Sequence, residues 1–325
     1  MAMTIVIAER LMQALLLLLA MSLIGFLGVH SIGNPVYNIV NIETATQQDI
    51  ERATITLGLD QPIWHQYLIF LKSVATGDFG VSYIYHVSAL SLVASKLPAT
   101  LELAVVAMLL AATVGIGLGL FAGRRHGSRM DRLILKASVY ALSVPSFWLS
   151  MMLILLGAVI AGWFPSGGRG ATAVAFGGEW SVLTFDGLKH LSLPALALAI
   201  PNMALIARLT RSGTIEVESL DFIRFCRAKG LSSHRILFRH TLPNISVPIV
   251  TIIALQFGGM LAFAVVVETI FAWPGVGKLL IDSVQMLDRP VVMATLTFVA
   301  VAFVTLNALV DLLYALLDPR VRLSA

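Results

Sequence analysis

Long apolar stretches alternate along the chain with shorter polar segments. A membrane-spanning helix needs roughly 20 mostly apolar residues. Six stretches meet that length, to within a few residues at each end: 9–30, 98–122, 134–162, 190–210, 245–269 and 290–314. The fourth contains Pro194 and Pro201, which membrane helices tolerate when neighbouring groups satisfy the freed carbonyls. The pattern therefore predicts an all-α integral membrane protein with six spans.

Composition supports a membrane protein over a soluble one. The chain has 325 residues, of which 58% are hydrophobic and 12% are charged, against about 25% charged residues in soluble domains. The first apolar run, from Leu11 to Val29, is longer than a signal-peptide core and lacks an A-x-A-like cleavage site after it, so we expect a retained span. The single cysteine, Cys226, excludes an internal disulfide.

The positive charges predict the orientation. With the N-terminus placed in the cytosol, fifteen of the 22 lysines and arginines fall in cytosolic segments and seven fall outside. Cationic residues favour the cytosolic side of membrane proteins. We therefore expect both termini in the cytosol, with outer loops at about 31–97 and 163–189.

The first outer loop, 31–97, has a helical pattern of its own. Thr46 and Asp49 form a capping-box-like start, and apolar residues follow at helical spacing. Such helices pack against a membrane domain or lie at its interface; a ligand-binding cap is the alternative. The second outer loop, 163–189, is rich in glycine, so we expect it to be flexible and assign it no chemistry.

Motifs for catalysis and cofactors are weak. The segment G-V-G-K-L at 275–279 lacks two positions of a phosphate-binding loop, where Ala272 and Leu279 stand instead of glycine and a hydroxyl residue. The seven histidines show no metal-ligand spacing, and no Ser/His/Asp arrangement is suggested. We therefore expect no enzyme, no metal site and no cofactor in this chain. By contrast, Gly115, Gly119 and Gly123 repeat a G-x-x-x-G spacing that lets a second helix approach closely.

Three acidic residues lie near the ends of predicted spans: Glu102, Glu268 and Asp311. Charge is costly within hydrocarbon, so intramembrane ionisable residues are functional candidates. A water-facing or ion-paired position is easy to reach near a helix end. A structural role and a place along a polar translocation pathway both remain open.

The segment 211–243 is the most polar part of the second half. Asp221 is a candidate N-cap, Gly230 suits a left-handed helix end, and Ser232 or Ser233 is placed to cap a second short helix. Ile223, Cys226 and Ala228 supply a weak apolar side. A loop that only fixes topology needs positive charge but no ordered helices. We therefore favour a docking surface for a cytosolic partner.

The residues of this segment, D-F-I-R-F-C-R-A-K-G-L at 221–231, resemble the cytosolic signature of permease subunits from binding-protein-dependent ABC importers. The signature is E-A-A-x-x-x-G followed, after nine residues, by I-x-L-P. Gly230 is the matching glycine, and Leu242 and Pro243 stand at the matching distance. The chain departs from it at four positions: Arg224, Phe225 and Cys226 in place of E-A-A, and His240 in place of isoleucine.

Further blocks extend the resemblance, to the dipeptide, oligopeptide and nickel class, over nearly the whole chain. They include L-P-A-T-L-E-L-A at 97–104, H-L-S-L-P-A-L-A-L-A at 190–199 and V-V-E-T-I-F-A-W-P-G-V-G at 266–277. The resemblance implies the type I ABC importer permease fold, with a helical periplasmic insertion after the first span. It implies the following parts: an N-terminal transmembrane helix at 1–30, the periplasmic loop at 31–97, the core transmembrane domain at 98–316 with a coupling loop at 211–243, and a cytosolic tail at 317–325.

The resemblance also implies a function and its partners. The chain would be a non-catalytic permease subunit in the bacterial inner membrane, importing short peptides or a related solute that a periplasmic or lipid-anchored binding protein delivers. A second, related permease and two cytosolic ATPase subunits, which bind ATP and magnesium, would complete the transporter; no nucleic acid is involved. The ATPase would dock on a coupling helix made of Asp221, Phe222, Arg224, Phe225, Arg227, Ala228, Lys229, Gly230 and Leu231.

Two other classes of function compete with this interpretation. An ion-coupled secondary transporter would use Glu102, Glu268 or Asp311, although the sequence shows no clear internal repeat and these charges lie near span ends. A membrane scaffold or sensor would only anchor cytosolic partners. The sequence does not specify the solute.

Overall fold

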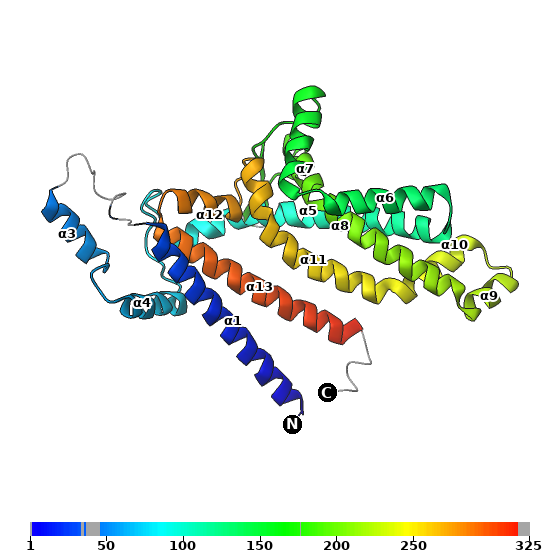
Figure 1. Ribbon diagram of the computed structural model, residues 1–325, viewed down its shortest axis with the longest axis horizontal. Helices are drawn as coiled ribbons and strands as arrows, with labels where there is room; N and C mark the ends of the chain where they lie inside the picture. Colours follow the sequence, from blue (N-terminus) through cyan, green and yellow to red (C-terminus); the bar gives the residue numbers. More distant parts are fainter. Residues whose placement is uncertain (1, 34–35, 37–45, 176, 318–325) are drawn as a thin grey trace. The chain divides into compact units, whose positions relative to one another are not determined.

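The computed structural model is almost wholly helical and describes residues 2–33, 36, 46–175 and 177–317 (Figure 1). A small antiparallel hairpin pairs β1 (Ala173–Ala175) with β2 (Gly178–Trp180). The helices follow in this order: α1 (Ala2–Ile32), α3 (Gln47–Thr56), α4 (Ile63–Thr76), α5 (Ala89–Arg124), α6 (Arg129–Ser143), α7 (Ser146–Leu153), η1 (Ile154–Ile160), α8 (Phe185–Ser219), α9 (Asp221–Ala228), α10 (Ser233–Ile236), η2 (Leu237–Thr241), α11 (Leu242–Ile270), α12 (Val276–Gln285) and α13 (Arg289–Leu317).

Each of the six predicted spans coincides with apolar helix. Three continuous helical stretches of the described chain are long and apolar enough to cross a membrane: Ala89–Arg124, Phe185–Ser219 and Ser233–Ile270. Two shorter apolar helices, Leu15–Ser31 and Arg289–Thr305, match the first and last predicted spans. Pro194 and Pro201 lie inside α8 without ending it. The number of spans stays a prediction.

The third predicted span is not one straight helix. The apolar stretch is divided between α6 and the pair α7–η1, and its two halves are bent by 106°. The break falls at Val144 and Pro145, both in extended conformation. Proline carries no N–H and disfavours helical conformation in the residue before it, so the helix ends there. The single span predicted over 134–162 is therefore wrong at Pro145, where the proline is a local signal for a break.

The chain divides into two compact units, and the boundaries fall at Pro98 and Trp273. The first unit contains α1, α3, α4, the start of α5, α12 and most of α13. Its core joins α5, α12 and α13 through buried apolar residues: Ala89, Val93, Val276, Leu279, Val291 and Ala294. The second unit runs over Ala99–Trp273 with the last part of α13, and its core lies among α5, α8 and α11.

Close packing of α5 on α8 confirms the predicted role of the repeated glycines. A Cβ atom added at Gly119 would lie 2.5 Å from Thr210 Cβ and 2.6 Å from the Ala207 carbonyl oxygen. One added at Gly123 would lie 2.6 Å from Thr214 Cβ. No real Cβ fits at these distances, so only glycine lets the two backbones approach this closely.

The first outer segment is helical, as predicted, and helical spacing leaves the buried face of its second helix, α4, undetermined. Thr46 caps α3 with both halves of a capping box to Asp49 in place. On α4, however, Trp64 and Leu68 are exposed, whereas Phe70 is buried against Phe26 of α1 at 5.8 Å between ring centroids. Both faces of α4 are apolar, so helical spacing alone does not identify the buried one.

Candidate functional site

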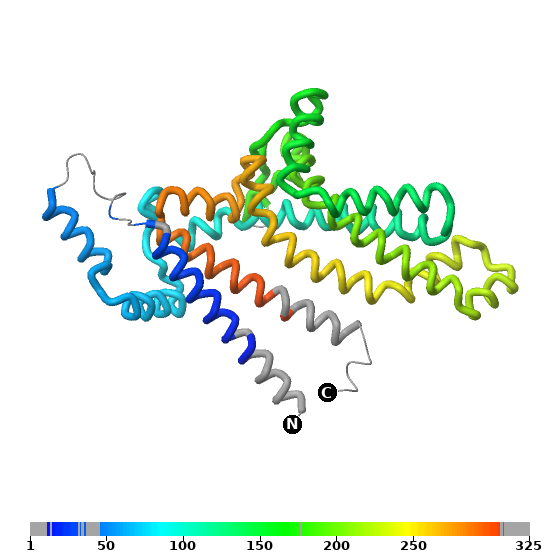
Figure 2. The backbone as a smooth tube through the Cα atoms, viewed as in Figure 1, coloured from blue at the N-terminus to red at the C-terminus, as the bar shows by residue number. Residues whose placement is uncertain are grey.

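The segment 221–243 forms the ordered helix, glycine turn and second helix that its sequence predicts (Figure 2). Helix α9 ends at Ala228, and Gly230 follows the C-cap Lys229 with a φ of 74°, in the left-handed region that glycine adopts without strain. The Ser232 side chain then caps α10 by accepting a hydrogen bond from the backbone N–H of Arg235. One detail is corrected: Leu220 is the N-cap of α9, and Asp221 is its first helical residue.

Helix α9 has one buried face and one exposed face. Ile223 and Cys226 are buried among apolar residues of α5, α8, η2 and α11. Phe222 and Phe225 point outward, with Phe225 60% exposed. Ala228, predicted to belong to the apolar side, is exposed. Cys226 therefore anchors the helix to its own chain, whereas Phe225 is left on the surface.

Charged side chains surround the exposed face. The ammonium of Lys229 lies 4.5 Å from the centre of the Phe225 ring, a cation–π arrangement. Arg224 pairs with Asp221 at 3.1 Å, and both side chains are largely exposed. The nine-residue segment 221–229 therefore presents an exposed aromatic ring beside a lysine and an exposed arginine–aspartate pair. Leu231, at the end of the predicted docking set, is half-buried.

Glu218 holds α9 in place, and sequence reasoning missed this residue. Its carboxylate accepts a hydrogen bond from Arg227 at 2.7 Å and lies 3.6 Å from the Arg124 guanidinium of α5. Glu218 stands at the end of α8, so one carboxylate connects three helices. Arg124 is predicted only as topology-setting charge and Arg227 as part of the docking helix, and no sequence pattern pairs either of them with Glu218.

A second ion pair, also missed, links α6 to α8. The guanidinium of Arg211 donates two hydrogen bonds to the Asp131 carboxylate, one of them at 2.9 Å. Asp131 also accepts the backbone N–H of Gly127 at 2.9 Å. A paired arrangement of this kind fixes two groups in a plane and gives geometric specificity. It holds the start of α6 against the helix that carries the docking segment.

The two buried glutamates lie in a polar cluster of the second unit. Glu102 accepts hydrogen bonds from the Arg169 guanidinium at 2.9 Å and from the backbone N–H of Val182. Arg169 in turn donates to the Glu179 carbonyl oxygen, which belongs to β2. The second outer loop is therefore attached to α5 by Glu102. The glycines of that loop predict flexibility and no chemistry, and a lone arginine among them gives no pairing signal.

The end of α11 completes this cluster. Glu268 is fully buried and accepts a hydrogen bond from the Thr100 hydroxyl at 2.6 Å. The Trp273 indole donates to the Ala99 carbonyl oxygen at 2.9 Å, and its ring lies 5.8 Å from the Arg169 guanidinium carbon. These contacts favour the structural role for Glu102 and Glu268. Asp311 lies on α13, where its side chain falls outside the described part of the structure.

Comparison with known families identifies the class of protein. Residues 115–323 match the family model described as "Binding-protein-dependent transport system inner membrane component", and residues 3–104 match its N-terminal companion. The chain belongs to this family. It is therefore a membrane protein and the membrane component of an ABC importer that has other subunits. The predicted class is confirmed, and the ion-coupled alternative finds no support.

Individual relatives are similar over almost their full length. The chain is 35% identical to the dipeptide transport system permease protein DppB of Alkalihalophilus pseudofirmus, covering 97% of this chain and 98% of that protein. It is 36% identical to the oligopeptide transport system permease protein AppB of Bacillus subtilis, with the same coverage. The glutathione transport system permease protein GsiC of Escherichia coli is also 36% identical, again with the same coverage.

A solved structure shares the fold. A chain of the MetNI methionine ABC transporter superposes with a TM-score of 0.54 at 15% sequence identity, covering 70% of this chain and 97% of that one. The predicted ABC importer permease fold is thereby confirmed. At this identity the likeness concerns the fold alone.

Proposed function

We propose that this chain is one of two permease subunits of an ATP-driven importer for short peptides or a related small solute. Its relatives are named for dipeptide, oligopeptide and glutathione transport. In this proposal, a periplasmic or lipid-anchored binding protein delivers the solute, and a related permease subunit forms the other half of the pathway. ATP and magnesium are bound by two cytosolic ATPase subunits, and this chain has no catalytic role.

The observation that carries the proposal is the construction of α9. Its buried residues, Ile223 and Cys226, tie it to the membrane helices, and its outward face offers Phe225 beside Lys229. A helix held in this way moves with the helices beneath it. Force applied to the exposed face by a closing ATPase pair would therefore reach α5, α8 and α11.

The length of α8 supports a docking segment outside the bilayer. With 35 residues, it extends about 52 Å at 1.5 Å per residue. The hydrocarbon core is about 30 Å thick. Roughly 20 Å of the helix is left to project into water, and α9 follows at its end. The cytosolic placement of that end follows from the positive charges and is part of the proposal.

The energy source is tested by reconstitution. The chain is placed in proteoliposomes with its permease and ATPase partners and the binding protein, and peptide uptake is measured. We expect uptake only with ATP and magnesium present. Uptake driven by a proton gradient without ATP would overturn the proposal.

The docking surface is tested by two matched truncations. Phe225→Ala removes the exposed ring of α9, and Phe185→Ala removes a ring that is 76% exposed at the opposite end of α8. Buried aromatic anchors dominate protein interfaces, so we expect Phe225→Ala to lower ATPase copurification at least about tenfold. Phe185→Ala should leave it unchanged. Equal ATPase retention by both variants would remove α9 as the docking helix.

A further inference from the structure

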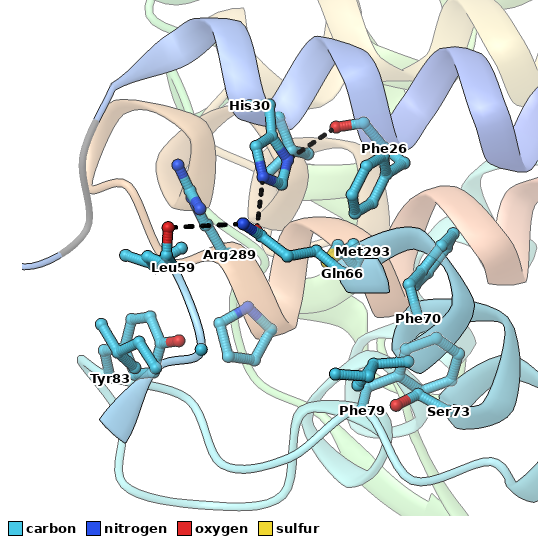
Figure 3. A pocket seen from close by; sticks show the side chains of 15 residues that line it. Phe26, His30, Leu59, Gln66, Phe70, Ser73, Phe79, Tyr83, Arg289 and Met293 are labelled. Atoms are coloured by element: carbon cyan, nitrogen blue, oxygen red, sulfur yellow. Dashed lines mark hydrogen bonds between the residues drawn. The ribbon is translucent and has the colours of Figure 1, made fainter. Parts of the chain in front are cut away.

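The first unit contains a cavity that the transport proposal does not use. Its volume is about 240 Å³, and it is lined by the end of α1, by α4, by the segment 57–59 and by the start of α13 (Figure 3). His30 and Arg289 stand at its polar side. They lie at the matching ends of two apolar helices, Leu15–Ser31 and Arg289–Thr305. The cavity is therefore at the level of a membrane surface, whichever side that is.

Arg289 brings a positive charge to the cavity. Its guanidinium donates to the Gly33 carbonyl oxygen at 2.7 Å, while its Nε is buried and has no hydrogen-bond partner among the residues that the structure describes. Among the described residues, no carboxylate pairs with it. The adjacent Asp288 is occupied elsewhere, because it accepts hydrogen bonds from the Ser82 hydroxyl and the Tyr83 backbone N–H. A buried donor without a partner is costly. A bound anion would accept the Nε–H hydrogen bond and balance the positive charge of Arg289.

Among the neighbouring side chains, Tyr83 adds a hydroxyl donor, whereas the polar groups of His30 and Gln66 already have partners. Burial raises the pKa of the Tyr83 hydroxyl, which therefore keeps its proton and lines the cavity as a donor. The His30 ring shares a hydrogen bond of 2.8 Å with the Gln66 side-chain oxygen, and the Gln66 amide donates to the Leu59 carbonyl oxygen. The oxygen of Gln66 is thus already engaged. These features favour a phosphate-like ligand.

A narrow apolar groove adjoins the cavity and is lined by α1, α4 and α13. The two spaces share three lining residues, Phe26, Phe70 and Met293. The groove has a volume of about 60 Å³ and runs as far as Leu18 on α1 and Val301 on α13. Twelve residues separate Arg289 from Val301, about 18 Å of helix. Half the hydrocarbon core is about 15 Å, so cavity and groove together span the depth of one leaflet.

We propose that this cavity binds a phospholipid, with its phosphate against Arg289 and one acyl chain along the groove between α1 and α13. An arginine at a helix end commonly extends toward the bulk headgroup region. Here the guanidinium is instead turned into a walled cavity, with its Nε buried. A soluble anion would occupy only the cavity beside Arg289, and the groove would then be filled by bulk lipid chains. The position of the apolar groove directly beside the charged cavity therefore favours a lipid.

Native mass spectrometry of the complete transporter in detergent tests the charge. Phosphatidylglycerol is titrated in, and bound lipid is counted for the unaltered chain and for Arg289→Gln. A lost hydrogen bond to a charged group is worth about tenfold in affinity or more, so we expect about a tenfold loss at one site. Arg289→Lys should retain part of the binding. The matched control is Arg52→Gln, an exposed position on α3, which should bind as the unaltered chain does.

The groove and the ligand source are tested in the same assay. Val301→Trp fills the groove, whereas Val299→Trp changes a residue of similar exposure on the same helix that does not line it. Only the first change should reduce lipid retention. Equal retention by the unaltered chain and Arg289→Gln would overturn the proposal. Displacement of the lipid by equimolar glycerol phosphate or inorganic phosphate would also overturn it, because the acyl chain would then contribute nothing.

Discussion

At the scale of single residues, Arg169 pairs with the buried carboxylate of Glu102 and so makes its burial possible. The Glu102 side chain is 1% exposed and that of Arg169 is 11% exposed, so neither charge is solvated to a useful extent. Removing both charges from water is expensive, and their attraction compensates only in part. The pair is therefore better understood as a device that places the second outer loop than as a large source of stability.

Arg169→Met should be strongly destabilising, because it leaves a buried carboxylate without its cation. We expect a loss of about 3–5 kcal/mol in the free energy of unfolding, measured by denaturation of the purified chain in detergent. The double change Arg169→Met with Glu102→Met should cost less than the single one. As a control, Arg224→Met breaks an exposed pair and should cost less than about 1 kcal/mol. Equal costs for the two arginines would contradict the burial argument.

At the scale of elements, the contact between α5 and α8 depends on glycines of α5 that face α8. Gly119 faces α8 with no room for a methyl group, whereas Gly117, two residues away, has no side-chain or foreign backbone atom within 4 Å of where a Cβ would stand. Helix packing therefore requires glycine at position 119 but not at position 117.

Substitution by alanine at each of the two positions tests this difference. Gly117→Ala should be neutral or slightly stabilising, because alanine is the better helix former by up to about 1 kcal/mol. Gly119→Ala should cost about 1–3 kcal/mol by overpacking. Thermal unfolding of the two variants in one detergent gives the comparison directly. A similar midpoint for both would show that the helices separate freely at this point.

Sequence patterns predicted the elements better than their partners. The six apolar stretches, the caps at Thr46 and Ser232 and the glycine end at Gly230 are local features, and each is found. Glu102 meets Arg169 across 67 residues and Glu218 meets Arg124 across more than 90. No spacing rule identifies such pairs, because their proximity depends on the packing of whole helices. The bend at Pro145 had a local signal that the apolar run concealed.

At the scale of the whole molecule, the orientation in the membrane is open to a direct test. Native Cys226 is 9% exposed and should react slowly with thiol reagents. New cysteines at Lys72 and Lys229, both exposed, then report on opposite sides. We expect a membrane-impermeant maleimide to label Lys72→Cys in cells with permeabilised outer membranes, and Lys229→Cys only after the inner membrane is opened. Labelling in the reverse order would invert the proposed topology.

The exposed ring of Phe225 has a consequence for how transport systems exchange parts. If α9 is the docking helix, its partner must offer a recess wide enough for an aromatic ring where the family signature has alanine. An ATPase shaped for the smaller residue would meet a steric obstacle, and one shaped for this ring would leave a void against other permeases. The ring would then restrict which ATPase subunits can dock, and it would keep this permease from assembling with the ATPases of related transporters in the same cell.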